Sequence, residues 1–257
     1  MSDFDRNYAA AQRGVGADRA VAIDQGLRAY MITVYNYMAT GVALTGVAAW
    51  GAFMMAGGDA ITRTPRGFAG LTAFGQFLFS PVGMIGMLLV TFGLVMFISF
   101  RIDKIQPGTA RALFFLYAGL LGVALSSIFI VYTGASITRV FFISAAAFGA
   151  LSLYGYTTQR DLSAFGTFLM MGVIGLFIAM IVNMFLKSTT MDFIISAIGV
   201  LVFAGLTAWD TQRIKEMYDP MEDGTIVGRK AVMGALSLYL DFINLFLFLL
   251  RFLGDRR

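Results

Sequence analysis

Two aspartates carry the most distinctive chemistry in this sequence, because each stands in an otherwise apolar stretch. Asp210 ends the stretch Gly205-Leu-Thr-Ala-Trp-Asp210, and Asp241 has long apolar runs on both sides. A charged side chain at the centre of a lipid bilayer costs at least about 2.5–3.5 kcal/mol on insertion scales. A carboxyl group in such a place is therefore expected to be paired, to be protonated or to have a functional role that offsets this cost.

The spacing of the two aspartates predicts that their carboxyl groups meet. The midpoint between them lies near Thr225 in a polar connection, so a hairpin of two helices places both residues at similar depth. Two carboxylates side by side cannot both ionise cheaply, so such a pair holds one proton or binds one hard cation through oxygen. Ca²⁺ is the candidate metal, although it prefers about 6–8 oxygen ligands. The alternative is that Asp210 is solvated at the membrane surface and pairs with Arg213, about one helical turn on.

Other polar residues also lie in or beside apolar stretches. Asp241, Asn244 and Arg251 fall within about 80° on a helical wheel at 100° per residue. They form a polar stripe that should face the interior of a helix bundle or a water-filled cavity. Hydrogen bonds across helices are expected from four further residues, which are Asn183, Ser126, Ser127 and Ser152.

Arg101 follows the apolar stretch that ends at Phe100. Its long side chain either snorkels to the membrane surface as an anchor or turns inward to pair with Asp210. The sequence alone leaves both interpretations open.

The composition places these residues in a membrane protein without a cofactor. The 257 residues are 58% hydrophobic and 13% charged, against about 45–50% and about 25% in soluble domains. The sequence contains no His and no Cys, which excludes disulfides, Cys/His metal centres and Ser-His-Asp triads. A soluble enzyme and a nucleic-acid-binding protein are disfavoured despite the net charge of +4. The Gly-x-Gly-Asp pattern of intramembrane aspartyl proteases is also absent, so we expect no enzyme.

Hydrophobic runs of about 20 residues, which span a bilayer core as helices, predict an all-α polytopic membrane protein. A polar tail (residues 1–29) and a short C-terminal tail (residues 255–257) flank a transmembrane domain (residues 30–254). The seven predicted spans are Tyr30–Phe53, Pro81–Phe100, Ala110–Tyr132, Val140–Tyr156, Phe165–Leu186, Phe193–Trp209 and Ala231–Leu253. Of the 19 Lys and Arg residues, 12 fall on the side of the N-terminus, which favours a cytoplasmic N-terminus.

The sequence closely resembles the Bax inhibitor-1 family, also called the transmembrane Bax inhibitor motif family, and its bacterial members in particular. The run from Ala235 to Gly254 is similar to the last helix of that family. The resemblance extends from Leu27 to Gly254, nearly the whole chain, and three further stretches carry it: Leu125–Thr133, Leu151–Ser163 and Gly205–Lys215.

This resemblance implies a bundle of seven helices in the bacterial inner membrane, with the last helix central and wrapped by the other six. It also implies a pH-sensitive calcium leak whose sensor is the pair Asp210 and Asp241, coupled to Arg101. Some bacterial relatives are described as substrates and modulators of a membrane-bound AAA protease.

Three functions therefore compete. The first is a passive, pH-gated leak of Ca²⁺ across the lipid bilayer. The second is exchange of protons for cations at the same pair of aspartates. The third is an interaction protein that modulates a membrane-bound protease.

Overall fold

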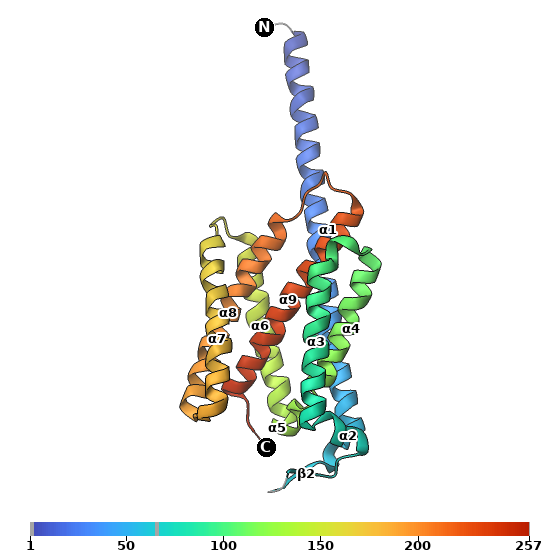
Figure 1. Ribbon diagram of the computed structural model, residues 1–257. Helices are drawn as coiled ribbons and strands as arrows, with labels where there is room; N and C mark the ends of the chain where they lie inside the picture. The colour runs from blue at the N-terminus through green and yellow to red at the C-terminus, as the bar shows by residue number, and fades with distance from the viewer. Residues whose placement is uncertain (1–2, 65–66, 257) are drawn as a thin grey trace.

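The computed structural model describes residues 3–64 and 67–256, and the side chains of residues 25–62 and 69–256. These residues form a bundle of long helices with a small hairpin at one end (Figure 1). The elements in chain order are α1 (Asp3–Ala56), η1 (Gly58–Ala60), β1 (Thr62–Thr64), β2 (Gly67–Ala69), α2 (Ala73–Leu78), α3 (Pro81–Arg101), η2 (Ile102–Lys104), α4 (Pro107–Leu125), α5 (Ile128–Val131), α6 (Gly134–Thr157), α7 (Ser163–Leu186), α8 (Thr189–Glu216) and α9 (Gly224–Leu253).

Seven helical stretches in the described part of the chain are long and apolar enough to cross a membrane. Each contains most of one span predicted from the sequence, so the predicted all-α membrane architecture is confirmed. Several helices begin earlier than the apolar stretch because a polar residue caps their first turn. Thr133, Ser188 and Asp223 do this for α6, α8 and α9, each accepting a bond from a backbone N–H.

The first helix is longer than the span within it. Helix α1 begins at Asp3 and continues without interruption to Ala56, whereas the stretch apolar enough to cross a membrane begins at Gln25. The division into a tail of residues 1–29 and a transmembrane domain stays a prediction.

The connection between α1 and α3 contains structure that hydrophobicity did not predict. Strands β1 and β2 pair in antiparallel fashion, with Thr62 opposite Ala69. The short helix α2 follows, capped by Thr72, whose Oγ1 accepts a hydrogen bond from the Gly75 N–H.

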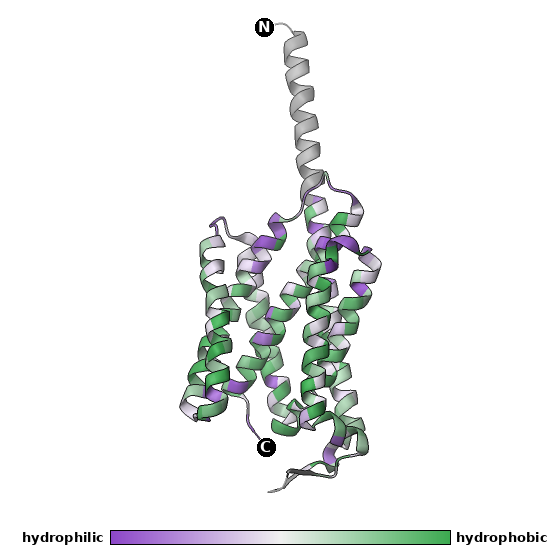
Figure 2. Cartoon of the chain, viewed as in Figure 1, coloured by the Kyte–Doolittle hydropathy of each residue, from purple (hydrophilic) through white to green (hydrophobic). Residues whose placement is uncertain are grey.

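Helix α9 lies at the centre of the bundle. It packs directly against α1, α4, α6 and α8, while α3 packs on α4 and α7 packs on α8 (Figure 1). The central position implied for the last helix is therefore confirmed, with α3 and α7 as an outer layer. Apolar residues dominate the middle of the helices, and hydrophilic residues gather toward the two ends (Figure 2).

Close helix contacts depend on glycine at a few positions. Gly122 of α4 faces the backbone of Thr45 in α1, so that a Cβ atom added there would collide with the Thr45 carbonyl oxygen. The Thr45 Oγ1 in turn donates to the Ala118 carbonyl oxygen at 2.9 Å and lies 2.6 Å from the Tyr239 hydroxyl of α9. This contact joins α1, α4 and α9 in the core.

We expect Gly122→Ala to destabilise the bundle, because the new methyl group meets backbone that cannot move aside. Overpacking of this kind typically costs about 1–3 kcal/mol. Gly119→Ala is the matched control, since a Cβ atom at Gly119, one turn away on the same helix, meets nothing within 4 Å. Thermal unfolding of the purified variants in detergent measures the difference, and equal melting temperatures for the two would contradict the expectation.

Candidate functional site: a carboxyl pair inside the bundle

Asp241 lies near the middle of the central helix and is almost completely enclosed. Asp241 is only 5% exposed, and its neighbours along the helix are also buried: Leu238, Tyr239, Phe242 and Ile243. Its Oδ2 atom accepts no hydrogen bond from the described residues. A buried carboxylate oxygen without a donor is costly, so this position favours a proton or a bound cation.

Asp210 of α8 is the partner of Asp241. The two carboxyl groups lie within hydrogen-bonding reach of each other, as the hairpin of α8 and α9 predicted. Two ionised carboxylates only accept hydrogen bonds, so this contact requires a proton on one of them. The structure thus places two acidic side chains where they can share one proton or clasp one cation.

A chain of hydroxyl groups fixes three helices beside this pair. The Tyr35 hydroxyl of α1 lies 2.5 Å from Ser152 Oγ of α6, which lies 3.0 Å from Thr211 Oγ1 of α8. Ser152 was expected to bond across helices, and it does. Tyr35 and Thr211 were missed, because a hydroxyl residue within a helix carries no sequence signal that distinguishes a cross-helix bond from a local one.

The two arginines expected to couple to the pair differ in their surroundings. Arg213 is close enough to Asp210 to act on it electrostatically, and its guanidinium also lies 5.5 Å from the centre of the Trp209 ring. Arg101 is exposed at the end of α3 and forms no ion pair with Asp210. Its exposure is compatible with the anchor interpretation, and both the anchor role and the coupling to the pair stay predictions.

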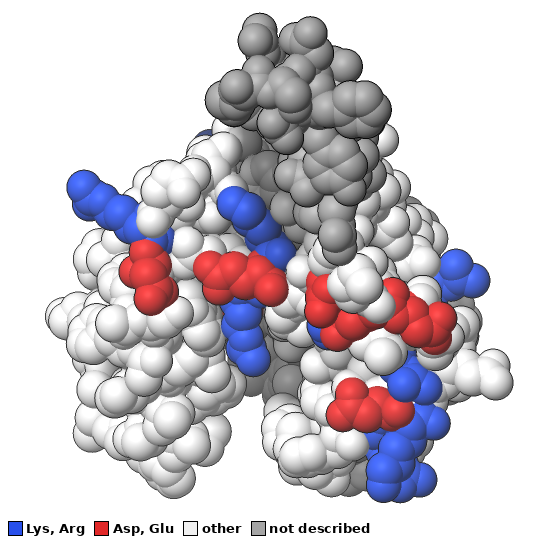
Figure 3. Space-filling model, turned by 90° about the horizontal axis from the view of Figure 1, so that it is seen from above, with Lys and Arg blue, Asp and Glu red and all other residues white. Residues whose placement is uncertain are grey.

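Charged side chains crowd the end of the bundle nearest the pair (Figure 3). Lys230 binds Glu222 at 2.6 Å, and the Arg229 Nε donates to the Ile105 carbonyl oxygen at 2.7 Å. Asp161 lies in the connection between α6 and α7, where hydrogen bonds from Ser163 lower the pKa of its carboxyl group. Asp161 therefore stays ionised through the neutral range and cannot supply a pH response there.

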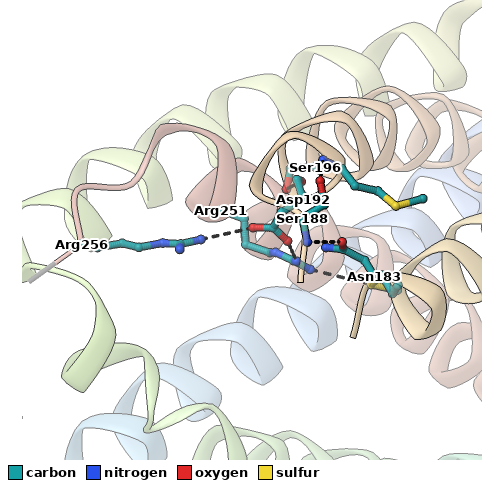
Figure 4. A network of polar contacts seen from close by, with 8 residues as sticks. Asn183, Ser188, Asp192, Ser196, Arg251 and Arg256 are labelled. Atoms are coloured by element: carbon teal, nitrogen blue, oxygen red, sulfur yellow. Dashed lines mark hydrogen bonds and ion pairs between the residues drawn. The ribbon is translucent and has the colours of Figure 1, made fainter. Parts of the chain in front are cut away.

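The remaining polar residues predicted from the sequence lie in α7 and α9: Asn183, Asn244 and Arg251. Arg251 forms an ion pair with Asp192 in the first turn of α8 (Figure 4). The Asn183 Oδ1 accepts a hydrogen bond from the Ser188 N–H at 3.0 Å, which shapes the turn between α7 and α8 instead of joining distant helices. The Asn244 Nδ2 donates to the Leu240 carbonyl oxygen one turn earlier at 2.8 Å. Asp192 was not predicted as a site residue, because an acidic residue close to the start of a helix is usually solvated.

The pair alone does not complete a calcium site. No group of three or more Asp, Glu, His or Cys side chains suited to a metal occurs among the residues with described positions. Ca²⁺ prefers about 6–8 oxygen ligands, so backbone, hydroxyl or water oxygens have to supply the remainder.

Comparison with known proteins agrees with this architecture. The family described as inhibitor of apoptosis-promoting Bax1 matches residues 27–257. Three bacterial proteins are similar over almost their full length. They are RP147 of Rickettsia prowazekii (48% identical, 91% of this chain and 92% of the relative), inner membrane protein YbhL of Escherichia coli (44%, 94% and 97%) and a Caulobacter vibrioides protein (42%, 100% and 100%).

We expect the acidic residues Asp241 and Asp192 to respond oppositely to removal of charge. Asp241→Asn should keep or raise the melting temperature, because an amide donates to Asp210 without requiring a proton. Asp192→Asn should lower stability by about 1 kcal/mol, since it weakens a partly exposed ion pair. Thermal unfolding in detergent compares the two variants. A loss in Asp241→Asn as large as that in Asp192→Asn would show that Asp241 serves mainly to hold the fold together.

Proposed function

The chain belongs to the Bax inhibitor-1 family of membrane proteins, and on this premise we propose that it is a pH-sensitive leak pathway for cations. Ca²⁺ is the proposed permeant ion, and Asp210 and Asp241 form the proposed sensor. The name of the Escherichia coli relative, inner membrane protein YbhL, supports the same location for this chain.

One observation carries this proposal: two carboxyl groups lie within hydrogen-bonding reach in the core of a seven-helix bundle. A shared proton joins α8 to α9 through this contact. Loss of that proton leaves two negative charges that repel each other and attract a cation. The pair therefore couples protonation to both helix packing and cation affinity.

The physical reasoning sets the direction of the pH response. With the proton in place, α8 and α9 are held together and the pathway is closed. As the pH rises, the proton is lost, the contact breaks and a cation is drawn to the carboxylates. Since the chain contains no His, a response near neutral pH has to come from a carboxyl pair of this kind.

The test is Ca²⁺ entry into dye-loaded proteoliposomes at about pH 6 and about pH 8. We expect wild-type protein to leak faster at the higher pH, and Asp210→Asn or Asp241→Asn to abolish most of that difference. Asp161→Asn is the control, because it removes an exposed carboxylate on the same side of the bundle without touching the pair. An unchanged pH profile in both Asp210→Asn and Asp241→Asn would rule out the sensor.

The same pair also supports a second candidate, exchange of protons for cations. Because one pair can hold either a proton or a cation, alternate loading would couple the two movements. An imposed pH gradient distinguishes the functions: an exchanger moves Ca²⁺ against its own gradient, whereas a leak only dissipates it. Folded protein that gives no flux in either assay would favour the third function, interaction with a membrane-bound protease.

A further inference from the structure

The C-terminal end of α9, opposite the end that carries Lys230, holds a second cluster of charges (Figure 4). Asp192 of α8 binds Arg251 through Oδ1 and Arg256 through Oδ2, the latter at 3.3 Å. A third helix joins the cluster, because the Arg251 Nη1 lies 3.8 Å from the Met180 Sδ of α7. Asp192 thereby ties the end of α9 and the C-terminal residues to the start of α8.

The C-terminal strap, defined as Gly254–Arg256, extends from this cluster to α6. The Thr133 N–H donates to the Asp255 carbonyl oxygen at 3.1 Å, and the Asp255 N–H donates to Ser136 Oγ at 2.9 Å. The Asp255 carboxylate also binds Arg139 at 2.8 Å. The strap therefore contacts two helices, α6 through Asp255 and α8 through Arg256.

A cavity of about 210 Å³ lies beside this cluster. Residues of α5, α7, α8 and α9 line it together with Tyr132. Arg251 and Asn244 lie among a mainly apolar set that includes Leu247 and Phe203. Asn244 follows Asp241 by three residues, which corresponds to a rise of about 4.5 Å along a helix. The cavity thus occupies the stretch of α9 between the carboxyl pair and the charged cluster.

The ion pairs hold this end of the bundle together. An arginine beside apolar surroundings needs a counter-charge, and Asp192 supplies it while holding Arg251 at the end of the cavity. A cation that moves along α9 from Asp241 meets the positive guanidinium of Arg251 before it leaves the bundle. Release of Arg251 from Asp192 lets the end of α9 separate from α8 and removes this barrier.

We propose that Asp192, Arg251 and the C-terminal strap form a gate that closes the cavity at the C-terminal end of α9. The role of the gate as a barrier to cations rests on the proposed leak function. Closure of the cavity by the gate can be measured separately, without any ion flux. The carboxyl pair provides the response to pH, and the ion-pair gate sets the basal leak.

The natural absence of cysteine allows a direct test with one introduced thiol. Leu247→Cys places the thiol in the cavity, and Ala60→Cys places one on an exposed turn as a reference. The probe is a trimethylammonium methanethiosulfonate, a small cation that labels thiols reached by water. Measurement in detergent gives both ends of the bundle access to water, so the orientation in a membrane does not matter.

We expect Leu247→Cys to react slowly in the closed protein and at least tenfold faster once Arg251→Gln is added. Glu222→Gln is the matched control, because the Glu222–Lys230 ion pair has similar exposure but lies at the other end of α9. The charge swap Asp192→Arg with Arg251→Asp should restore slow labelling. Asn244→Cys repeats the test if Leu247→Cys fails to give a single gel-filtration peak.

Two outcomes would overturn the gate. The first is labelling of Leu247→Cys at the rate of Ala60→Cys in the otherwise wild-type chain, and the second is an unchanged rate with Arg251→Gln. The flux assay separates this failure from failure of the leak. Gated labelling without any Ca²⁺ flux contradicts the leak but not the closure. A pH-sensitive leak that Arg251→Gln leaves unchanged at both pH values contradicts the gate alone.

Discussion

The burial of a carboxyl group on α9 is the constraint that organises the rest of this bundle. Asp241 cannot face lipid, where the cost of a charge is several kcal/mol. It also has no donor among the described residues for its Oδ2 atom. Helix α9 must therefore be enclosed on all sides at this level, and α1, α4, α6 and α8 provide that enclosure. Asp210 then supplies a polar partner with which a proton or cation can be shared.

The two polar regions of α9 solve the problem of buried charge in different ways. At Asp241 two groups of like charge meet, which is stable only when something else, a proton or a cation, lies between them. At Arg251 opposite charges meet, so the contact with Asp192 is complete without any added species. The first arrangement depends on what the solution supplies, whereas the second is complete within the protein. The proposed pathway along α9 therefore has separate elements for sensing and for closure.

The sequence predicted the spans and the meeting of Asp210 with Asp241, because both follow from hydrophobicity and hairpin geometry. It did not predict the hairpin of β1 and β2, since short strands in a glycine-rich connection have little hydrophobic pattern. Asp192 was also missed, because its importance comes from Arg251 and Arg256, which lie far away in the chain. The cross-helix bond of Ser152 was predicted as a type, but its partners Tyr35 and Thr211 depend on helix rotations that spacing alone does not determine.

Apolarity alone would also have misplaced the layers of the bundle. In a soluble protein the most apolar helix is the most buried, but lipid reverses this relation because it accepts apolar side chains and rejects polar ones. Only 11% of the span in α7 is buried and 17% of that in α3, although both are more apolar than α9, whose span is 72% buried. The polar stripe of Asp241, Asn244 and Arg251 identifies the inner helix better than its hydrophobicity does. The same residues that make α9 costly to expose are those proposed to sense protons and to gate the pathway, so the central position of the helix and its function have one physical cause.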